Sequence, residues 1–239
     1  MGKKIMILGA SILQLPAIKQ AKAMGLDVIA VDINPNAIGF KVPNIKKEII
    51  STIDIPSVIE AAKKHHIDGI MTLATDMPMR TVAAVVKELG LIGIQEETAL
   101  KATNKAKMRL ALQKENVPIP KFFKVSNVKE YQNAVKKLNM PFIVKPVDSS
   151  GSRGIFEVID INNNQLIKQA YEYCRPFSRN GDVIVEEYMK GPEVIVETLS
   201  INGDCHVIKI TDKLTTGAPH FVEMAHSQPT RHSQKIIEQ

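Results

Sequence analysis

The sequence contains no tryptophan, and aromatic residues make up only 5% of its 239 residues. Proteins that bind single-stranded nucleic acids without sequence preference stack bases on aromatic rings. Blocks of five or six like charges are also missing, although the net charge is +6, and the lysines are spread along expected helix faces. The composition therefore argues against a nucleic-acid partner and favours a solvated lysine surface with a modest attraction for small anions.

Cysteine and long apolar runs are scarce as well. The two cysteines, Cys174 and Cys205, lie far apart, so neither has the short partner spacing of a metal site. Free thiols in a reducing cytosol are the expected state. No apolar run approaches the ~20 residues that cross a bilayer, and the lysines that precede the first apolar run are not followed by the cleavage pattern of a signal peptide. We expect a cytoplasmic protein with no membrane partner.

The first part of the chain, residues 1–98, alternates between strand and helix patterns. Short apolar runs predict buried strands at residues 3–10, 27–33, 69–74 and 91–94. Amphipathic segments between them predict helices at residues 15–25, 56–66 and 78–90. This alternation indicates a parallel sheet with helices on its faces. We predict an α/β, Rossmann-like first domain over residues 1–98.

The pattern changes near residue 96. Residues 96–120 predict a helical connector that ends at two prolines. Beyond it, strands are predicted at 122–125, 142–146, 155–160, 183–189, 193–201 and 205–212, and helices at 128–139 and 162–174. The last two strands are separated by the turn residues Asn202, Gly203 and Asp204. We predict an α+β second domain with antiparallel hairpins over residues 99–239.

The turn after the first strand has the placement of a dinucleotide fingerprint. Gly9 ends that strand, and Asp32 ends the second strand. However, Ser11 and Gln14 stand where the second and third glycines of the fingerprint should be. Without those glycines the backbone cannot approach a pyrophosphate closely. A tight turn followed by a polar strand end is the favoured interpretation, and an NAD(P)-binding oxidoreductase domain is the weaker alternative.

The segment VKPVDSSGSRG, residues 144–154, has the features of a phosphate-binding loop. Lys145 closes a buried strand, so its ammonium group can be held over a cleft. Residues 148–154 then supply flexible backbone N–H groups and the guanidinium of Arg153, which suit a polyphosphate. Taken singly, a lysine at the end of a buried strand is more often structural or surface-facing.

A second segment, VIVEEYMKGPE, covers residues 183–193. It places acidic residues after a strand and then a tyrosine and a methionine. The backbone of such a strand end can offer one N–H and one C=O to the edge of adenine, while Met189 packs on the ring. The carboxylate of Glu193 could reach ribose hydroxyls.

The order of these features resembles the ATP-grasp superfamily. The order is a lysine in a helix that ends in Val-Pro, then strand-Lys-Pro, a small-residue loop and Glu-Glu-Tyr-Met…Gly-Pro-Glu. The first part of the chain resembles the domain that precedes ATP-grasp in biotin carboxylase, carbamoyl-phosphate synthetase and purine-biosynthesis ligases. The resemblance covers essentially the whole chain. It implies a Rossmann-like pre-ATP-grasp domain followed by α+β ATP-grasp subdomains.

The resemblance also implies a nucleotide site. Lys105 would contact the α-phosphate and Lys145 the α- and β-phosphates, while residues 148–154 would form a mobile lid. Residues 186–189 would be the adenine hinge, with Glu193 on the ribose. The residues assigned in this way are Lys105, Lys145, Asp148, Ser149, Ser150, Gly151, Ser152, Arg153, Gly154, Glu186, Glu187, Tyr188, Met189, Glu193 and His220.

Histidine assignments are less definite. His220 matches a nucleotide-site histidine of carbamoyl-phosphate synthetase-like members, but it could equally be a polar loop residue, and His226 is nearly as well placed. The other histidines are expected at the surface: His65, His66, His206 and His232.

Members of the superfamily use ATP and Mg²⁺ to convert a carboxylate to an acylphosphate, which an amine then attacks. Their metal ligands lie on strands that follow a helix like the one expected to start in residues 230–239. We therefore expect the metal ligands beyond residue 239, so that the chain is a fragment or one half of a split protein.

In the split case, a partner chain would supply the C-terminal half, and the chain itself would be a non-catalytic nucleotide-binding subunit. A homodimer is the alternative assembly. The expected partners are ATP and a small carboxylate, and Ser11 and Asp76 are candidates for the substrate side.

Overall fold

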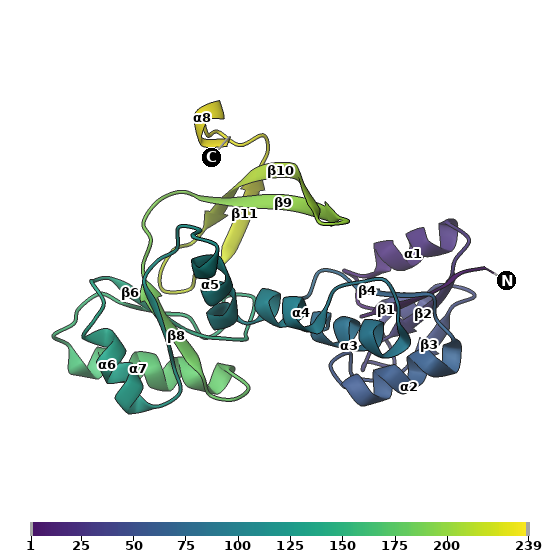
Figure 1. Ribbon diagram of the computed structural model, residues 1–239, viewed down its shortest axis with the longest axis horizontal. Coiled ribbons are helices and arrows are strands. Elements are labelled where there is room, and N and C mark those ends of the chain that lie inside the picture. Colours follow the sequence, from purple (N-terminus) through teal and green to yellow (C-terminus); the bar gives the residue numbers. More distant parts are fainter. Residues whose placement is uncertain (1, 238–239) are drawn as a thin grey trace. The chain divides into compact units, whose positions relative to one another are not determined.

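The structure is a computed structural model that describes residues 2–237. The chain divides into two compact units, residues 1–111 and 112–239 (Figure 1). Helix α4 (Glu96–Thr103) and most of α5 (Lys105–Lys114) fall in the first unit, where α4 packs on α3 (Met79–Leu89). A domain boundary after residue 98 stays a prediction.

The first unit contains a four-stranded parallel sheet. Its strands are β1 (Lys4–Leu8), β2 (Asp27–Val31), β3 (Lys46–Glu48) and β4 (Gly69–Thr72), in the order β3-β2-β1-β4. The remaining helices of this unit are α1 (Leu15–Ala23), the short 3-10 helix η1 (Ile38–Lys41) and α2 (Ile55–His65). The predicted parallel α/β sheet is thus confirmed.

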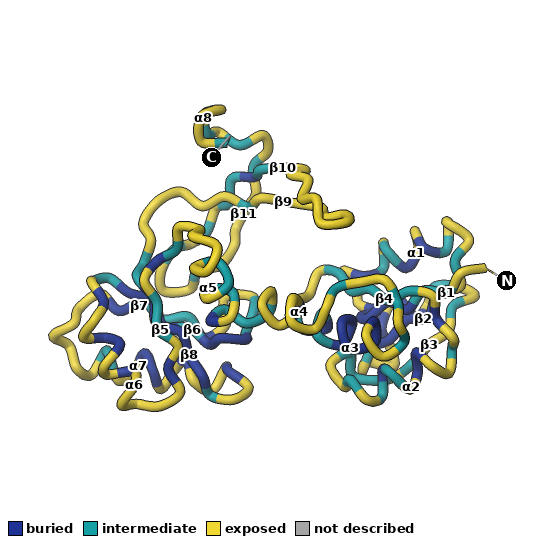
Figure 2. The backbone as a smooth tube through the Cα atoms, in the orientation of Figure 1, coloured by how far each residue is buried: buried dark blue, intermediate teal, exposed yellow. Residues whose placement is uncertain are grey.

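Alternation along the strands builds a core on each face of this sheet. Met6, Leu8 and Ile29 pack with residues of α2 and α3 on one face. Ile7 and Val28 pack with α1 and η1 on the other. Burial is therefore concentrated in the two central strands and the inner helix faces, which Figure 2 shows in dark blue.

One predicted strand of this unit is wrong. Residues 91–94 form no strand, because they are used to finish α3. Gly90 ends the helix with φ +66°, and the N–H of Leu91 bonds back to the carbonyl of Val86 at 2.9 Å. Leu91 and Ile94 then pack against the core, which is the hydrophobic contact typical of such a helix end.

The sequence reading missed β3, whose letters are Lys-Lys-Glu. Lysine-rich edge strands carry no apolar pattern, since an edge is protected by charge. This omission explains why His65 was wrongly expected at the surface. Its side chain is 10% exposed, and its Nε2 lies 2.6 Å from Oε1 of Glu48 on β3, which also bonds Lys64. Burial raises the pKa of Glu48, but the hydrogen bonds from Lys64 and His65 outweigh it and lower the pKa.

The second unit begins with a four-stranded antiparallel sheet. Its strands are β5 (Phe122–Val125), β6 (Phe142–Pro146), β7 (Phe156–Val158) and β8 (Val183–Glu187), in the order β5-β8-β6-β7. Helices α6 (Val128–Val135) and α7 (Asn164–Cys174) cover one face, and the short 3-10 helix η2 (Arg175–Phe177) follows α7. Asn127 starts α6 by accepting the N–H of Glu130 at 3.0 Å, and Glu130 accepts the N–H of Ser126 at 2.8 Å.

The core of this sheet faces the helices. Phe142 and Val144 of β6 and Val183 and Val185 of β8 pack against α6 and α7. Cys174 belongs to this core and donates to the carbonyl of Val144 at 3.2 Å. Burial raises the pKa of its thiol to about 12, so Cys174 stays protonated, whereas free Cys205 is exposed.

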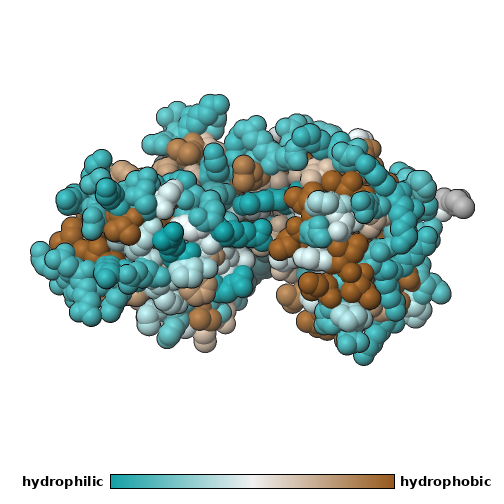
Figure 3. Space-filling view, turned by 90° about the horizontal axis from the view of Figure 1, so that it is seen from below, coloured by the Kyte–Doolittle hydropathy of each residue, from teal (hydrophilic) through white to brown (hydrophobic). Residues whose placement is uncertain are grey.

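A three-stranded antiparallel sheet follows, in the order β11-β10-β9. It consists of β9 (Glu193–Ile201), β10 (Asp204–Thr215) and β11 (Glu223–Ser227), with the short helix α8 (Gln234–Ile237) after it. The predicted turn between β9 and β10 is confirmed, while β11 was not foreseen. β9 and much of β10 are exposed, as the tube in Figure 2 shows. Hydrophilic side chains cover much of the face drawn in Figure 3, with hydrophobic patches over the first unit.

Candidate functional site

The face of the β5–β8 sheet that α6 and α7 leave uncovered carries a pair of opposite charges. In the antiparallel register Ile143 lies opposite Glu186, and Lys145 lies opposite Ile184. Opposed residues share a face, so Lys145 and Glu186 are diagonal neighbours on the side away from the core. Their Nζ and Oε1 atoms form an ion pair. The structure thus brings together two residues that the sequence assigned to phosphate and adenine separately.

This pair is largely withdrawn from water. The side chain of Lys145 is 17% exposed and that of Glu186 is 6% exposed. Each of these charges stabilises the other, because a charge withdrawn from water loses hydration free energy that an opposite charge must offset. A nucleotide phosphate that attracted Lys145 would therefore compete with Glu186 for the same ammonium group.

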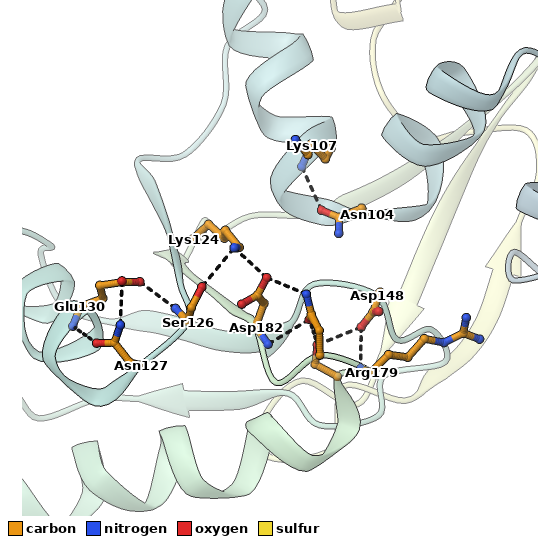
Figure 4. Close-up of polar contacts among 11 residues, drawn as sticks. Asn104, Lys107, Lys124, Ser126, Asn127, Glu130, Asp148, Arg179 and Asp182 are labelled. Carbon is orange, nitrogen blue, oxygen red and sulfur yellow. Dashed lines mark hydrogen bonds and ion pairs between the residues drawn. The ribbon is translucent and has the colours of Figure 1, made fainter.

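The predicted lid loop, residues 148–154, is fixed at its first end. The carboxylate of Asp148 is 9% exposed and accepts hydrogen bonds from Ser178 Oγ at 3.0 Å and from the N–H of Arg179 at 3.3 Å (Figure 4). Asp148 thus anchors the loop, and its assignment to nucleotide binding gains no support from these contacts.

The second end of the lid loop packs against Phe177, next to the residues that hold Asp148. Gly154 has φ +75°, and a Cβ there would lie 2.7 Å from the ring of Phe177, so only glycine fits. Near the tip, Gly151 and Ser152 also adopt left-handed backbone conformations, with φ +66° and +57°. Arg153 donates from Nε to the carbonyl of Ser150 at 3.0 Å, so its guanidinium group folds back on the loop.

The predicted adenine hinge, residues 186–189, comprises the end of β8 and the two residues after it. The N–H groups of Glu187 and Tyr188 donate to the carbonyls of Lys121 and Pro141, at 3.0 and 3.1 Å. Adenine would therefore need another hinge donor than these two. Met189 is 65% exposed, so its side chain is accessible to an adenine ring.

The remaining predicted nucleotide residues are less constrained. Glu193, expected on the ribose, lies 3.1 Å from Nζ of Lys213. His220 is exposed, and His226 pairs with Glu223 at 2.6 Å, so both histidine assignments stay open. Lys105 begins α5 in the first unit, and its contact with the α-phosphate stays a prediction.

A polar network at the edge of the same sheet was missed by the sequence reading. Lys124 on β5 bonds Asp182 Oδ2 at 2.7 Å and Ser126 Oγ at 3.1 Å, and Asn180 donates to Asp182 at 2.9 Å (Figure 4). Burial raises the pKa of Asp182, but the hydrogen bonds from Lys124 and the other donors outweigh it and lower the pKa. The only signal for it in the sequence is the run Ser-Arg-Asn-Gly-Asp, whose residue types are common in turns.

The first unit holds a separate cavity of about 390 Å³ at the carboxyl ends of its strands. Its lining includes Gly9, Ser11, Gln14, Asp32 and Thr75. Such a position in a parallel α/β sheet is the usual place for a ligand.

The polar groups of this cavity favour the tight-turn interpretation over a dinucleotide site. Asp32 accepts hydrogen bonds from the N–H groups of Ala10 and Asn34, at 2.8 and 2.9 Å. The side chain of Gln14 lies so close to Gly9 that a Cβ on Gly9 would meet it at 2.9 Å. Gln14 is also held by Ser11 Oγ at 2.6 Å and by the carbonyl of Leu73 at 2.8 Å. The carboxylate of Asp32 is thus used by hydrogen bonds to the backbone, and the side chain of Gln14 covers Gly9.

No group of three or more His, Cys, Asp or Glu side chains within residues 2–237 could hold a metal ion. None of the helices in the same range is long and apolar enough to cross a membrane.

Comparisons with known proteins agree with this architecture. Residues 138–239 match the family model of the ATP-grasp domain. The chain is 30% identical over 192 residues to a formate-dependent phosphoribosylglycinamide formyltransferase from Burkholderia cenocepacia, an alignment that covers 78% of this chain and 46% of that protein.

Solved structures show the same fold. Phosphoribosylglycinamide synthetase from Anaerococcus prevotii superposes with a TM-score of 0.75 and 26% identity, over 100% of this chain and 58% of that one. The biotin carboxylase domain of 2-oxoglutarate carboxylase from Hydrogenobacter thermophilus, solved with MgADP, ADP and bicarbonate, superposes with a TM-score of 0.82 and 17% identity, over 100% and 56%.

Fold and comparisons together define an α/β Rossmann-like unit followed by α+β ATP-grasp subdomains. The chain belongs to the ATP-grasp superfamily. It spans about half the length of the relatives that it matches.

The Lys145–Glu186 pair can be tested by its stability. Lys145→Met takes the lysine away from the buried carboxylate of Glu186, so we expect the free energy of unfolding to fall by about 2–3 kcal/mol. Lys145→Met combined with Glu186→Gln removes both charges and should lose less than the single variant. Chemical denaturation measures both, together with Glu186→Gln alone, which completes the cycle. A double variant that loses the sum of the two single effects would show that the charges do not interact.

The Asp182 network predicts a pH dependence. A lowered pKa stabilises the fold fully above the ordinary aspartate value of 3.8, and this contribution is lost as the pH falls through the still lower folded value. Lys124→Met removes the main partner, so its midpoint of chemical denaturation should fall less between pH 5 and pH 3 than that of the unaltered chain. Lys129→Met, at an exposed site on α6, is the control. Equal acid sensitivity in all three proteins would contradict the expected role.

Proposed function

We propose that this chain binds ATP on the open face of the β5–β8 sheet, as the nucleotide-binding part of an ATP-grasp ligase that activates a carboxylate as an acylphosphate. The observation that carries the proposal is the Lys145–Glu186 pair. It lies where β6 runs into the lid loop and β8 runs into the hinge, so a cation and an acceptor stand beside the two segments expected to hold phosphates and adenine.

The chemistry assigns a role to each part. Lys145 would donate to the phosphates and leave Glu186 able to accept from the amino group of adenine. The backbone N–H groups of residues 149–153 would surround the terminal phosphates, where fixed donors stabilise the charge of phosphoryl transfer. A closed lid would also keep water from the acylphosphate. Magnesium, when bound, would neutralise phosphate charge, and we propose that its ligands lie outside residues 2–237.

The cavity of the first unit is the proposed site for the acceptor substrate. Ser11 lines it, and Asp76 lies in the segment beside the lining residues Thr75 and Met77. Two of the relatives take their names from phosphoribosylglycinamide, and one of these is named as formate-dependent. We therefore propose a small carboxylate and an amine acceptor of that type as the reactants, and we keep a carbamoyl-phosphate synthetase-like ligase as the broader alternative.

The exposed face of β9 and β10 supports a second proposal, that further polypeptide completes the domain. Val196 and Val207 are 49% and 61% exposed, and both line a hollow of about 410 Å³ with Ile236 of α8. Apolar patches of this kind mark surfaces that another segment covers. The covering segment would be either more of the same polypeptide or a partner chain that supplies the metal ligands, with a homodimer as the third arrangement.

Calorimetry with ATP, with and without magnesium, tests the proposed nucleotide site. We expect the chain to bind ATP and Lys145→Met to bind it about 10- to 100-fold more weakly, because a charged hydrogen-bond donor is lost. Lys129→Met should bind like the unaltered chain. Binding of NAD that Asp32→Ala abolishes, with no binding of ATP, would overturn the proposal in favour of a dinucleotide-binding domain.

A further inference from the structure

Phe221 touches two separate parts of the proposed nucleotide site. It lies in the loop 216–222 between β10 and β11. Its backbone carbonyl accepts a hydrogen bond from Ser152 Oγ, at the tip of the lid loop, at 2.7 Å. Its ring packs edge-on against Tyr188 of the hinge, with centroids 6.2 Å apart and ring planes at 74°. One residue therefore contacts both the segment expected at the phosphates and the segment expected at adenine.

Both partners in the lid contact have an unusual backbone. Ser152 has φ +57° and Phe221 has φ +49°. This left-handed region is unfavourable for residues with a side chain, and for a bulky one it is an outlier. Strained conformations persist only where the surrounding contacts over-determine them, and they gather at ligand clamps and switch regions. That two such residues, 69 positions apart, meet in one hydrogen bond is the observation that calls for a function.

The loop that carries Phe221 is closed on itself. The N–H of Phe221 donates to the carbonyl of Gly217 at 2.8 Å. The N–H of Thr216 donates to the carbonyl of Val222 at 2.9 Å, and the N–H of Val222 donates to Thr216 Oγ1 at 3.0 Å. These bonds hold the backbone of the loop, including the carbonyl of Phe221, while the contact with Tyr188 places the ring.

The lid loop has its other described anchors at its base. Asp148 is held by Ser178 and Arg179, and Gly154 lies against Phe177. These contacts fix where the loop starts and ends, but they do not fix its tip. The hydrogen bond from Ser152 to Phe221 supplies a contact at the tip, and the ring contact to Tyr188 relates that tip to the hinge.

We propose that Phe221 is a positioning residue that sets the lid tip relative to the adenine hinge before the nucleotide binds. The proposal rests on the proposed function, since it concerns the same nucleotide. A loop that is already placed loses less conformational freedom when it closes on a ligand, so the junction strengthens nucleotide binding. Phe221 acts through Ser152 and Tyr188 and does not itself touch the nucleotide.

Hydrogen exchange on the nucleotide-free chain tests the junction directly. Ser152→Ala removes the hydroxyl and should speed exchange in the lid tip alone. Phe221→Ala removes the ring that packs on Tyr188, so the carbonyl that holds Ser152 is no longer tied to the hinge, and exchange should speed both in residues 150–153 and in residues 187–189. Val222→Ala, in the same loop, keeps the backbone bonds of its neighbours and serves as the control. Faster exchange in Phe221→Ala confined to residues 216–222 would overturn the proposal.

Calorimetry with ADP tests the consequence for binding. Loss of one hydrogen bond that places the lid predicts about fivefold weaker ADP binding by Ser152→Ala. Phe221→Ala should be weakened at least as much, and the double variant little more than Phe221→Ala, because the two residues act as one unit. Affinity equal to that of the unaltered chain in both single variants would refute the positioning role.

The two proposals fail in different ways. If the unaltered chain does not bind ADP, the proposed function is refuted for this chain, and the exchange pattern still decides whether Phe221 joins the lid to the hinge. If ADP binds but the variants match the unaltered chain in both measurements, the nucleotide site stands and the junction is refuted.

Discussion

The ion pair between Lys145 and Glu186 is the constraint on which the rest of the site depends. The helices α6 and α7 need an apolar face to pack on, and strand alternation then sends every other residue to the opposite face. On that face the antiparallel register of β6 and β8 makes these two charges diagonal neighbours. The lid loop follows β6 and the hinge follows β8, so the pairing of two strands also fixes where phosphate and adenine would be held.

Much of the fold could be predicted from the sequence, because the burial pattern is local. The parallel strands β1, β2 and β4 are apolar runs, and α3 and α7 show one apolar face each. Elements that do not depend on an apolar pattern were not predicted. The edge strand β3 is lysine-rich, and the apolar residues after Gly90 finish a helix instead of forming a strand. His65 is buried against a strand that the sequence did not reveal.

The candidate site divides in the same way. Lys145 and Glu186 could each be chosen from the letters around them, whereas their pairing depends on which strands are neighbours, and a single sequence does not give that. Asp148 was read as part of a phosphate loop because small and polar residues surround it, yet its partners come from residues 178 and 179. The Lys124–Asp182 network and the Phe221 junction are likewise contacts between distant segments. The turn at Gly9 shows the reverse case, since missing glycines in the sequence disfavoured a dinucleotide site and the contacts of Gln14 and Asp32 agree with that interpretation.

The most direct measurement of the central claim is a hydrogen-exchange footprint of ATP on the chain. If the open face of the β5–β8 sheet is the nucleotide site, ATP should slow exchange in residues 144–154 and 186–189 and leave residues 9–14 and 30–34 unchanged. Protection of the Gly9 turn and of the end of β2, without any at Lys145 or Glu186, would contradict the account.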